Sequence, residues 1–214
     1  MMAAAAATAP FPTVHIAPGS VNVPIATFPA APKTPPSDVN QIAQEIVASA
    51  NDAIAKKDYS ALSNLFLETG FWRDHLALTW DFRTVQGPSA IRQFLENAAS
   101  SPGGFRLTKL EVDGSAPHRA PKIHGPGVHF FVDVETVAGR GQGVVHAVED
   151  HGKWKIFTLY TSLRELKGHE EQTYARRPVG VEHGGIPGRT NWADRRRLAA
   201  DFKDGSEPAV FILG

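Results

Sequence analysis

The 214-residue chain contains no cysteine, so it can form no disulfide, offer no thiolate nucleophile and bind no metal through sulfur. It also lacks a charge surplus, because 22 Lys and Arg residues balance 22 Asp and Glu residues. Phosphate groups and anionic membrane surfaces both select proteins with an excess of positive charge. The composition therefore argues against nucleic acid or a membrane surface as the main partner.

Long apolar runs and nucleotide-binding motifs are missing as well. No run approaches the roughly 18 apolar residues that a membrane-spanning helix needs. The N-terminal sequence MMAAAAATAPFP lacks the basic residues of a secretory signal. The chain has no complete GxGxxG, no phosphate-binding loop and no nucleophile elbow. We therefore expect a soluble, cytoplasmic protein that holds no complete cofactor site.

The chain divides into four regions by composition. Residues 1–37 carry eight prolines, ten alanines and Lys33 as their only formal charge, which predicts a disordered tail. Residues 38–166 have the apolar periodicity of a folded domain. Residues 167–206 are rich in glycine, proline and charge and read as a linker with a short helix that begins at Thr190-Asn191. Residues 207–214 read as a lone apolar strand.

Periodicity predicts helices first and a sheet afterwards. Apolar residues at helical spacing predict three helices, over residues 38–57, 58–67 and 88–98. Between the second and third helices, residues 71–84 predict short extended pieces around a turn. The apolar period then changes to two, which predicts strands over residues 105–112, 128–137, 144–149 and 154–163, with residues 115–127 as a loop. This order predicts an α+β fold in which a curved antiparallel sheet wraps the three helices as a cone with an open mouth.

The stretch FWRDHLALTWDFRT, residues 71–84, combines large aromatic side chains with charges of both signs. That mixture suits a pocket, since pockets are mostly apolar with a few placed polar groups, although an ordinary half-buried strand remains an alternative. Side chains alternate along a strand, so Trp72 and Asp74 share one face. We expect that face to point inward, and Arg73 is the next candidate for the pocket after Trp72 and Asp74. The predicted pocket residues are Trp72, Arg73, Asp74, Trp80 and Phe82.

Two places offer candidate catalytic groups. Asp74 is a candidate general base in the pocket. A hairpin turn at Gly139-Arg140 would place Asp133 opposite His146, where an aspartate and a histidine can act as base and orienter. An exposed cross-strand pair without catalytic role is the favoured alternative, because one bulge would change the register.

Histidines gather in one further part of the chain, at His118, His124 and His129. Metal sites favour tighter spacing on a fixed element, such as two histidines four residues apart on a helix. We therefore expect solvated loop histidines and no metal site.

Several of these motifs resemble one known family. Trp72-Arg73-Asp74 and Thr79-Trp80-Asp81-Phe82 resemble the N-terminal domain of fungal flavin-containing monooxygenase-like proteins. The order of helices and strands resembles the nuclear transport factor 2-like, or SnoaL-like, cone fold. The Asn-Trp-x-x-Arg-Arg helix within residues 190–196 and the acidic-Pro strand of residues 207–214 add to the resemblance, which covers about residues 38–214.

The resemblance implies that a longer relative binds FAD and NADPH. In that relative the last strand leads into a glycine-rich turn that holds the FAD pyrophosphate at a helix N-terminus. Gly214 would begin this turn, and the sequence stops there. We therefore expect an N-terminal fragment, from a truncated product or a mis-split gene model, that cannot bind flavin by itself.

Three functions remain open at this point. The first is an accessory domain of a flavin-dependent monooxygenase, which would shape substrate access or assembly while the absent cofactors carry the oxygen chemistry. The second is a free-standing SnoaL-like isomerase, cyclase or dehydratase that binds a small apolar molecule in the cone and uses Asp74 or the Asp133/His146 pair. The third is a non-catalytic binding module or a homodimer that pairs through the outer face of the sheet.

Overall fold

A computed structural model of the chain describes residues 27–30, 36, 38–177, 188 and 190–201. The chain forms two compact units, Met1–Glu171 and Gln172–Gly214. Most of the predicted N-terminal tail and all of the predicted strand 207–214 lie outside the described residues. No helix among the described residues is both long and apolar enough to cross a membrane.

The described residues of the first unit form three helices and seven strands. Its helices are α1 (Val39–Lys56), α2 (Tyr59–Ser63) and α3 (Gly87–Ser100), with a short 3-10 turn at Pro117–Arg119. Its strands are β1 (Phe66–His75), β2 (Phe82–Gln86), β3 (Leu107–Val112), β4 (Lys122–His124), β5 (Gly127–Thr136), β6 (Gly139–Asp150) and β7 (Lys153–Leu166).

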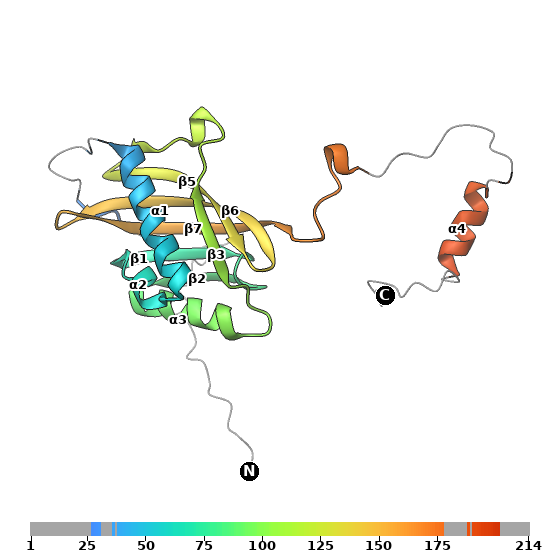
Figure 1. Ribbon diagram of the computed structural model, residues 1–214, viewed down its shortest axis with the longest axis horizontal. Coiled ribbons are helices and arrows are strands. Elements are labelled where there is room, and N and C mark those ends of the chain that lie inside the picture. Colours follow the sequence, from blue (N-terminus) through green and yellow to red (C-terminus); the bar gives the residue numbers. More distant parts are fainter. Residues whose placement is uncertain (1–26, 31–35, 37, 178–187, 189, 202–214) are drawn as a thin grey trace, which may run out of the picture. The chain divides into compact units, whose positions relative to one another are not determined.

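All seven strands belong to one sheet, with the order β2-β1-β7-β6-β5-β3 and with β4 paired to β5. Every pairing is antiparallel except that of β1 with β7, which is parallel. Helix α1 crosses one face of the sheet and α3 lies beside β1 and β2 (Figure 1). The predicted α+β fold, with three helices against a curved sheet, is therefore confirmed.

The first helix shows how the core forms. The Asp38 carboxylate accepts a hydrogen bond from the Gln41 amide at 2.9 Å and caps the helix, which ends where Lys57 takes the left-handed conformation at φ 55°. Its apolar stripe is buried against the sheet. The core combines this stripe with Phe66, Trp72, Ile91, Phe94, Phe130, Val145 and Leu159.

The second predicted helix is too long, because it ends at Ser63 and the chain enters β1 at Phe66. Gly70 lies inside this strand, where a Cβ would come within 2.9 Å of the Ile156 carbonyl oxygen on β7. The pairing of β1 with β7 is irregular between Phe66 and Phe71. Contacts with a distant strand thus decide a conformation that local periodicity assigned to a helix.

The sheet differs from the prediction at two further places. The hairpin between β5 and β6 turns at Val137-Ala138, so that Gly139 and Arg140 already belong to β6. The predicted loop 115–127 contains β4, which pairs with His129 and its neighbours on β5. The predicted strand from residue 105 begins at Leu107.

The second unit is described by one helix, α4 (Trp192–Ala200), and a 3-10 turn at Tyr174–Arg176. Asn191 caps α4 by accepting a hydrogen bond from the Asp194 amide at 2.8 Å, which confirms the predicted start. Trp192 and Leu198 are both exposed. The Arg196 guanidinium lies 5.2 Å from the centre of the Trp192 ring.

Candidate functional site

The buried residues of the FWRDHLALTWDFRT stretch take part in a chain of hydrogen bonds. Trp72 and Asp74 point to the helix side of β1, opposite Leu159 and Thr161 on β7. The Trp72 indole donates to the Thr161 hydroxyl at 2.9 Å, and that hydroxyl donates to the Asp74 carboxylate at 2.5 Å. All three residues have 0% relative exposure. The predicted inward orientation of Trp72 and Asp74 is correct, and Thr161 is the partner that sequence reasoning missed.

The second Asp74 oxygen organises the turn that follows β1. It accepts a hydrogen bond from the Leu78 amide at 3.0 Å, and the Ala77 and Thr79 amides also bond to the carboxylate. Burial raises the pKa of Asp74, while the bonds from Thr161 and the backbone amides oppose that rise. Since Leu76 just before these amides has a φ of 64°, the carboxylate stabilises an unusual backbone path.

Trp72 is enclosed by aromatic side chains rather than lining an open mouth. Its ring stacks on Phe66 at 5.7 Å between ring centres and meets the Phe94 ring edge-on at 5.9 Å. Both neighbours belong to the buried core. In this conformation a ligand cannot reach either Trp72 or Asp74 without displacing core side chains.

Arg73 and His75 point to the face of the sheet that α1 and α3 do not cover, here called the outer face, as alternation requires. The Arg73 Nε–H donates to His75 Nε2 at 2.8 Å, so the ring proton resides on Nδ1, which lies 3.2 Å from the Tyr160 hydroxyl. Burial, followed by the positive charge of Arg73, lowers the pKa of His75. This neutral tautomer is held between two polar partners and is a further arrangement that sequence reasoning missed.

The remaining predicted pocket residues are on the surface. Trp80 is 56% exposed and meets the Phe105 ring edge-on at 4.8 Å. Phe82 is 65% exposed and contacts His75 at 4.8 Å between ring centres. The five predicted pocket residues therefore occupy three environments: the core, the outer face of the sheet and the exposed turn.

The predicted pairing of Asp133 with His146 is wrong. Because the hairpin turns at Val137-Ala138, Asp133 lies opposite Gln142, and His146 lies opposite His129. Asp133 is on the outer face near Asp113 and Glu111, and burial followed by these two charges raises the pKa of Asp133. The two candidate catalytic residues do not form a base and orienter pair.

Histidines from three strands instead lie together on the outer face. The rings of His124 and His146 stack at 5.2 Å, and His129 lies 5.7 Å from each of them. His124 thus belongs to a strand and not to the predicted loop, while His129 lies on β5, within the predicted strand 128–137. Burial lowers the pKa of both His129 and His146. Among the described residues, no group of histidine and acidic side chains has the arrangement to hold a metal ion.

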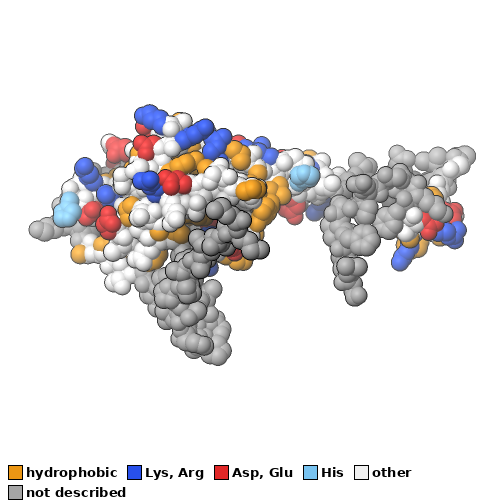
Figure 2. Space-filling view, turned by 90° about the horizontal axis from the view of Figure 1, so that it is seen from below, with side chains coloured by type: hydrophobic (Ala, Val, Ile, Leu, Met, Phe, Trp, Pro, Cys, Tyr) orange, Lys and Arg blue, Asp and Glu red, His pale blue; other side chains and the backbone are white. Residues whose placement is uncertain are grey.

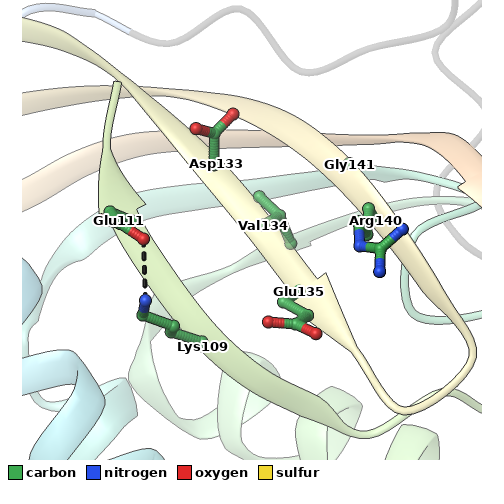
Figure 3. A pocket seen from close by; sticks show the side chains of 7 residues that line it. All are labelled: Lys109, Glu111, Asp133, Val134, Glu135, Arg140 and Gly141. Carbon is green, nitrogen blue, oxygen red and sulfur yellow. Dashed lines mark hydrogen bonds and ion pairs between the residues drawn. The ribbon is translucent and has the colours of Figure 1, made fainter. Parts of the chain in front are cut away.

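A hollow of about 230 Å³ lies on the outer face where β3, β5 and β6 run together. Figure 3 shows its charged side chains; one ion pair, between Lys109 and Glu111 at 2.7 Å, lies within it. The hollow is lined by Lys109, Glu111, Asp133, Val134, Glu135, Arg140 and Gly141.

Several of these charged side chains form ion pairs. Glu135 also pairs with Lys167 at 2.7 Å. Acidic and basic side chains lie beside one another over the described surface seen in Figure 2. A charged, paired lining of this kind does not suit the small apolar ligand that the sequence suggested.

No protein-family model matches the chain, and no curated protein matches it. Solved structures of similar fold include a nuclear transport factor 2-like protein of unknown function from Silicibacter pomeroyi, with 14% identity and a TM-score of 0.44 over 58% of this chain and 94% of that one. A cystatin-like domain of unknown function from Nostoc punctiforme shows 14% identity and a TM-score of 0.44 over 79% and 90% of the two chains. Aln2 from a Streptomyces species shows 13% identity and a TM-score of 0.45 over 61% and 94%. These likenesses concern the fold and not an activity.

Proposed function

We propose that this chain is the N-terminal accessory domain of a flavin-dependent monooxygenase, in which it serves assembly rather than chemistry. The observation that carries the non-catalytic role is the position of Asp74. Its carboxylate is buried and engaged by Thr161 and by backbone amides of the following turn. A general base must reach the proton that it removes, and Asp74 has no open side from which substrate can approach.

The parent enzyme is proposed from the sequence motifs. Three charged residues of these motifs have a structural task in this fold: Asp74 fixes a turn, Arg73 positions His75, and Asp81 accepts a hydrogen bond from the Phe82 amide at 2.9 Å. These three tasks are structural and require no catalysis in this domain. The FAD and NADPH of the parent enzyme would then be bound by a separate dinucleotide-binding region.

The experiment is a paired binding measurement on the purified chain. FAD titration followed by flavin fluorescence is expected to show no binding at micromolar concentration. A thermal-shift screen of small apolar molecules is expected to show no stabilisation. Flavin binding at micromolar affinity would overturn the assignment of the cofactor site to a separate region.

The alternative, an isomerase, cyclase or ligand-binding module, has its own outcome in the same screen. It predicts a ligand that stabilises the wild type and whose effect is lost in Asp74→Asn or in Asp133→Asn. Stabilisation that depends on Asp74 would replace the accessory role with ligand binding in the cone. Asp81→Asn is the matched control, because its exposed carboxylate lies outside the core.

The genomic sequence downstream of codon 214 tests the parent enzyme directly. An open frame that continues into a glycine-rich turn supports the flavoprotein. A stop codon followed by sequence with no such frame contradicts it.

A further inference from the structure

The outer face of the sheet carries a positive charge at Arg73 that no carboxylate balances. Arg73 is part-buried on β1. Its guanidinium donates to His75 Nε2 at 2.8 Å and to the Thr84 hydroxyl at 3.5 Å, and both acceptors are neutral. Within the described part of the chain, no Asp or Glu forms an ion pair with Arg73. A guanidinium that has lost part of its hydration without gaining an anion favours an anionic partner.

Tyr160 supplies a second hydrogen-bond donor beside Arg73. The two residues are cross-strand partners on β1 and β7, so their side chains leave the same face next to each other. Because His75 Nε2 accepts from Arg73, the ring proton is on Nδ1, which lies 3.2 Å from the Tyr160 oxygen. The Tyr160 oxygen accepts that proton, so the hydroxyl keeps its own proton for another acceptor. Two neighbouring donors are thus available to one ligand.

Apolar surface borders the two donors. The His75 ring lies 5.0 Å from the Tyr160 ring and 4.8 Å from the Phe82 ring, measured between ring centres. Phe82 is 65% exposed and therefore offers open ring surface. On the other side, Val144 of β6 lies opposite Tyr160. This border suits an apolar body attached to an anionic group.

The open patch is small, because other side chains cover its surroundings. Across β6, the partner of Val144 is Phe131 on β5, and the Arg119 guanidinium lies 5.3 Å from the centre of the Phe131 ring. Two residues further along β6, the His146 ring meets the Phe28 ring edge-on at 5.0 Å. A protein partner of standard size would need about 800 Å² on this surface. The limited patch fits a small molecule better.

We propose that Arg73 and Tyr160 form a binding site for a small carboxylate with an apolar body, such as an aromatic acid. The Nε–H of Arg73 is used by His75, so the terminal amino groups of the guanidinium bind the carboxylate. The Tyr160 hydroxyl donates to one carboxylate oxygen, and the apolar body lies against the His75 and Phe82 rings. A single cation matches a monoanion, which disfavours a phosphate dianion.

This site is separate from the core carboxylate of Asp74. Asp74 follows Arg73 in the sequence but points to the helix side of β1, so binding at Arg73 does not involve it. The carboxylate site and the accessory role can therefore fail independently of each other.

An NMR titration of the full-length chain with benzoate tests the site. Benzoate should shift the amide signals of β1 and β7 around Arg73 and Tyr160, with a dissociation constant in the millimolar range. Benzamide has the same ring without the charge and should leave these signals in place at the same concentration. The proposal is overturned if benzoate does not shift these signals, or if benzamide shifts them equally.

Substitutions assign the two donors. Arg73→Gln should weaken benzoate binding about tenfold or more, since charge-assisted hydrogen bonds are lost. Tyr160→Phe keeps the ring and should weaken it about threefold. Arg83→Gln is the matched control, because Arg83 pairs with Asp81 at 2.9 Å, and it should bind as the wild type does. An affinity that either Arg73→Gln or Tyr160→Phe leaves unchanged would overturn the site.

A further variant covers the case in which Arg73→Gln fails to fold. Arg73→Lys keeps the charge but loses the planar fork, and it should bind benzoate more weakly than the wild type. Equal binding by Arg73→Lys would contradict recognition of the carboxylate by the guanidinium.

Two measurements separate other occupants from a small carboxylate. Inorganic phosphate should bind more weakly than benzoate, and equal binding would overturn the preference for a carboxylate. If an acidic side chain of a second copy filled the site, the wild type would self-associate and Arg73→Gln would not. Sedimentation equilibrium that shows this difference would overturn the proposal, whereas equal masses for the two proteins support it.

Discussion

Thr161 and Asp74 are 87 positions apart in sequence, and the Thr161 hydroxyl donates a 2.5 Å hydrogen bond to the Asp74 carboxylate inside the core. The same hydroxyl accepts from the Trp72 indole at 2.9 Å. The β1–β7 pairing is parallel, which brings Asp74 and Thr161 into register. One threonine therefore links the buried aromatic core to the carboxylate that shapes the next turn.

Thr161→Val is expected to destabilise the domain by about 2–3 kcal/mol. The substitution keeps the shape of the side chain but leaves the Trp72 donor and one Asp74 oxygen unpaired in the core. Urea unfolding followed by tryptophan fluorescence measures the change. Thr161→Ser keeps the hydroxyl and should cost less than the valine variant. Equal stability of wild type and Thr161→Val would show that this hydrogen-bond chain does not stabilise the fold.

Asn51→Ala is expected to cost roughly 2 kcal/mol of unfolding free energy, since two part-buried hydrogen bonds between α1 and β3 are lost. The Asn51 amide donates to the Leu110 carbonyl at 2.8 Å, and its oxygen accepts from the Leu110 amide at 2.9 Å. Chemical denaturation measures the difference. Asn40→Ala, at an exposed position of the same helix, is the control and should change stability by only a few tenths of a kcal/mol. Equal losses for both variants would contradict the role of Asn51.

Asp113 is expected to give the domain an acid-sensitive contribution to stability. Hydrogen bonds from Ser115, together with Arg119, lower the pKa of Asp113 from 3.8 to about 2. The folded state then binds fewer protons than the unfolded state, so this stability is present above about pH 4 and is lost as pH falls toward 2. After allowance for solvent screening at the partly exposed Arg119, the contribution is about 1–2 kcal/mol.

Urea midpoints between pH 5 and pH 2 measure this dependence. Asp113→Asn should be less stable at pH 5 and should lose less stability on acidification than the wild type does. Asp81→Asn, at an exposed ion pair, serves as the control and should keep the wild-type slope. If the urea midpoint of Asp113→Asn fell with pH as steeply as that of the wild type, Asp113 would not be the source of this acid sensitivity.

The histidines of the outer face are expected to make the stability of the domain depend on pH in a higher range than Asp113 does. Burial lowers the pKa of His129 and His146 below the ordinary value of 6.5. Both histidines are neutral in both states well above pH 6.5. As pH falls below 6.5, the unfolded state takes up protons first, so stability decreases. His124 and Lys122 face the same cluster and add to the penalty for a charged ring.

Thermal unfolding between pH 8 and pH 5 measures the effect. His146→Gln should reduce the loss of stability on acidification, whereas His118→Gln, at an exposed turn position, should not. A loss that is the same in wild type and His146→Gln would assign the pH dependence to other groups.

Much of the fold was predictable because it depends on local signals. The α1 stripe has strict helical spacing and the Asp38 cap marks its start. Alternation correctly placed Trp72 and Asp74 on one face of a strand and Arg73 and His75 on the other. The switch from helical to strand periodicity likewise predicted the order of helices and antiparallel strands. These features need only the chemistry of neighbouring residues.

The candidate site was less predictable, because its geometry depends on register and on partners far along the chain. A shift of the β5–β6 turn to Val137-Ala138 separates Asp133 from His146 and brings His146 beside His129. The segment after α2 became a strand because it pairs with β7, about 90 residues later. No local pattern reports such pairings.

The sequence by itself determined the absence of thiol chemistry, the neutral charge, the α+β order of elements and the inward direction of Trp72 and Asp74. Only the tertiary structure decided what that inward direction means. The partners that enclose Asp74 come from β7 and the following turn, and the side chains that enclose Trp72 come from β1 and α3. A buried carboxylate can either face a ligand or be satisfied by donors inside the core. Which of the two holds depends on donors far away in the sequence, and only the folded chain brings those donors within hydrogen-bonding distance.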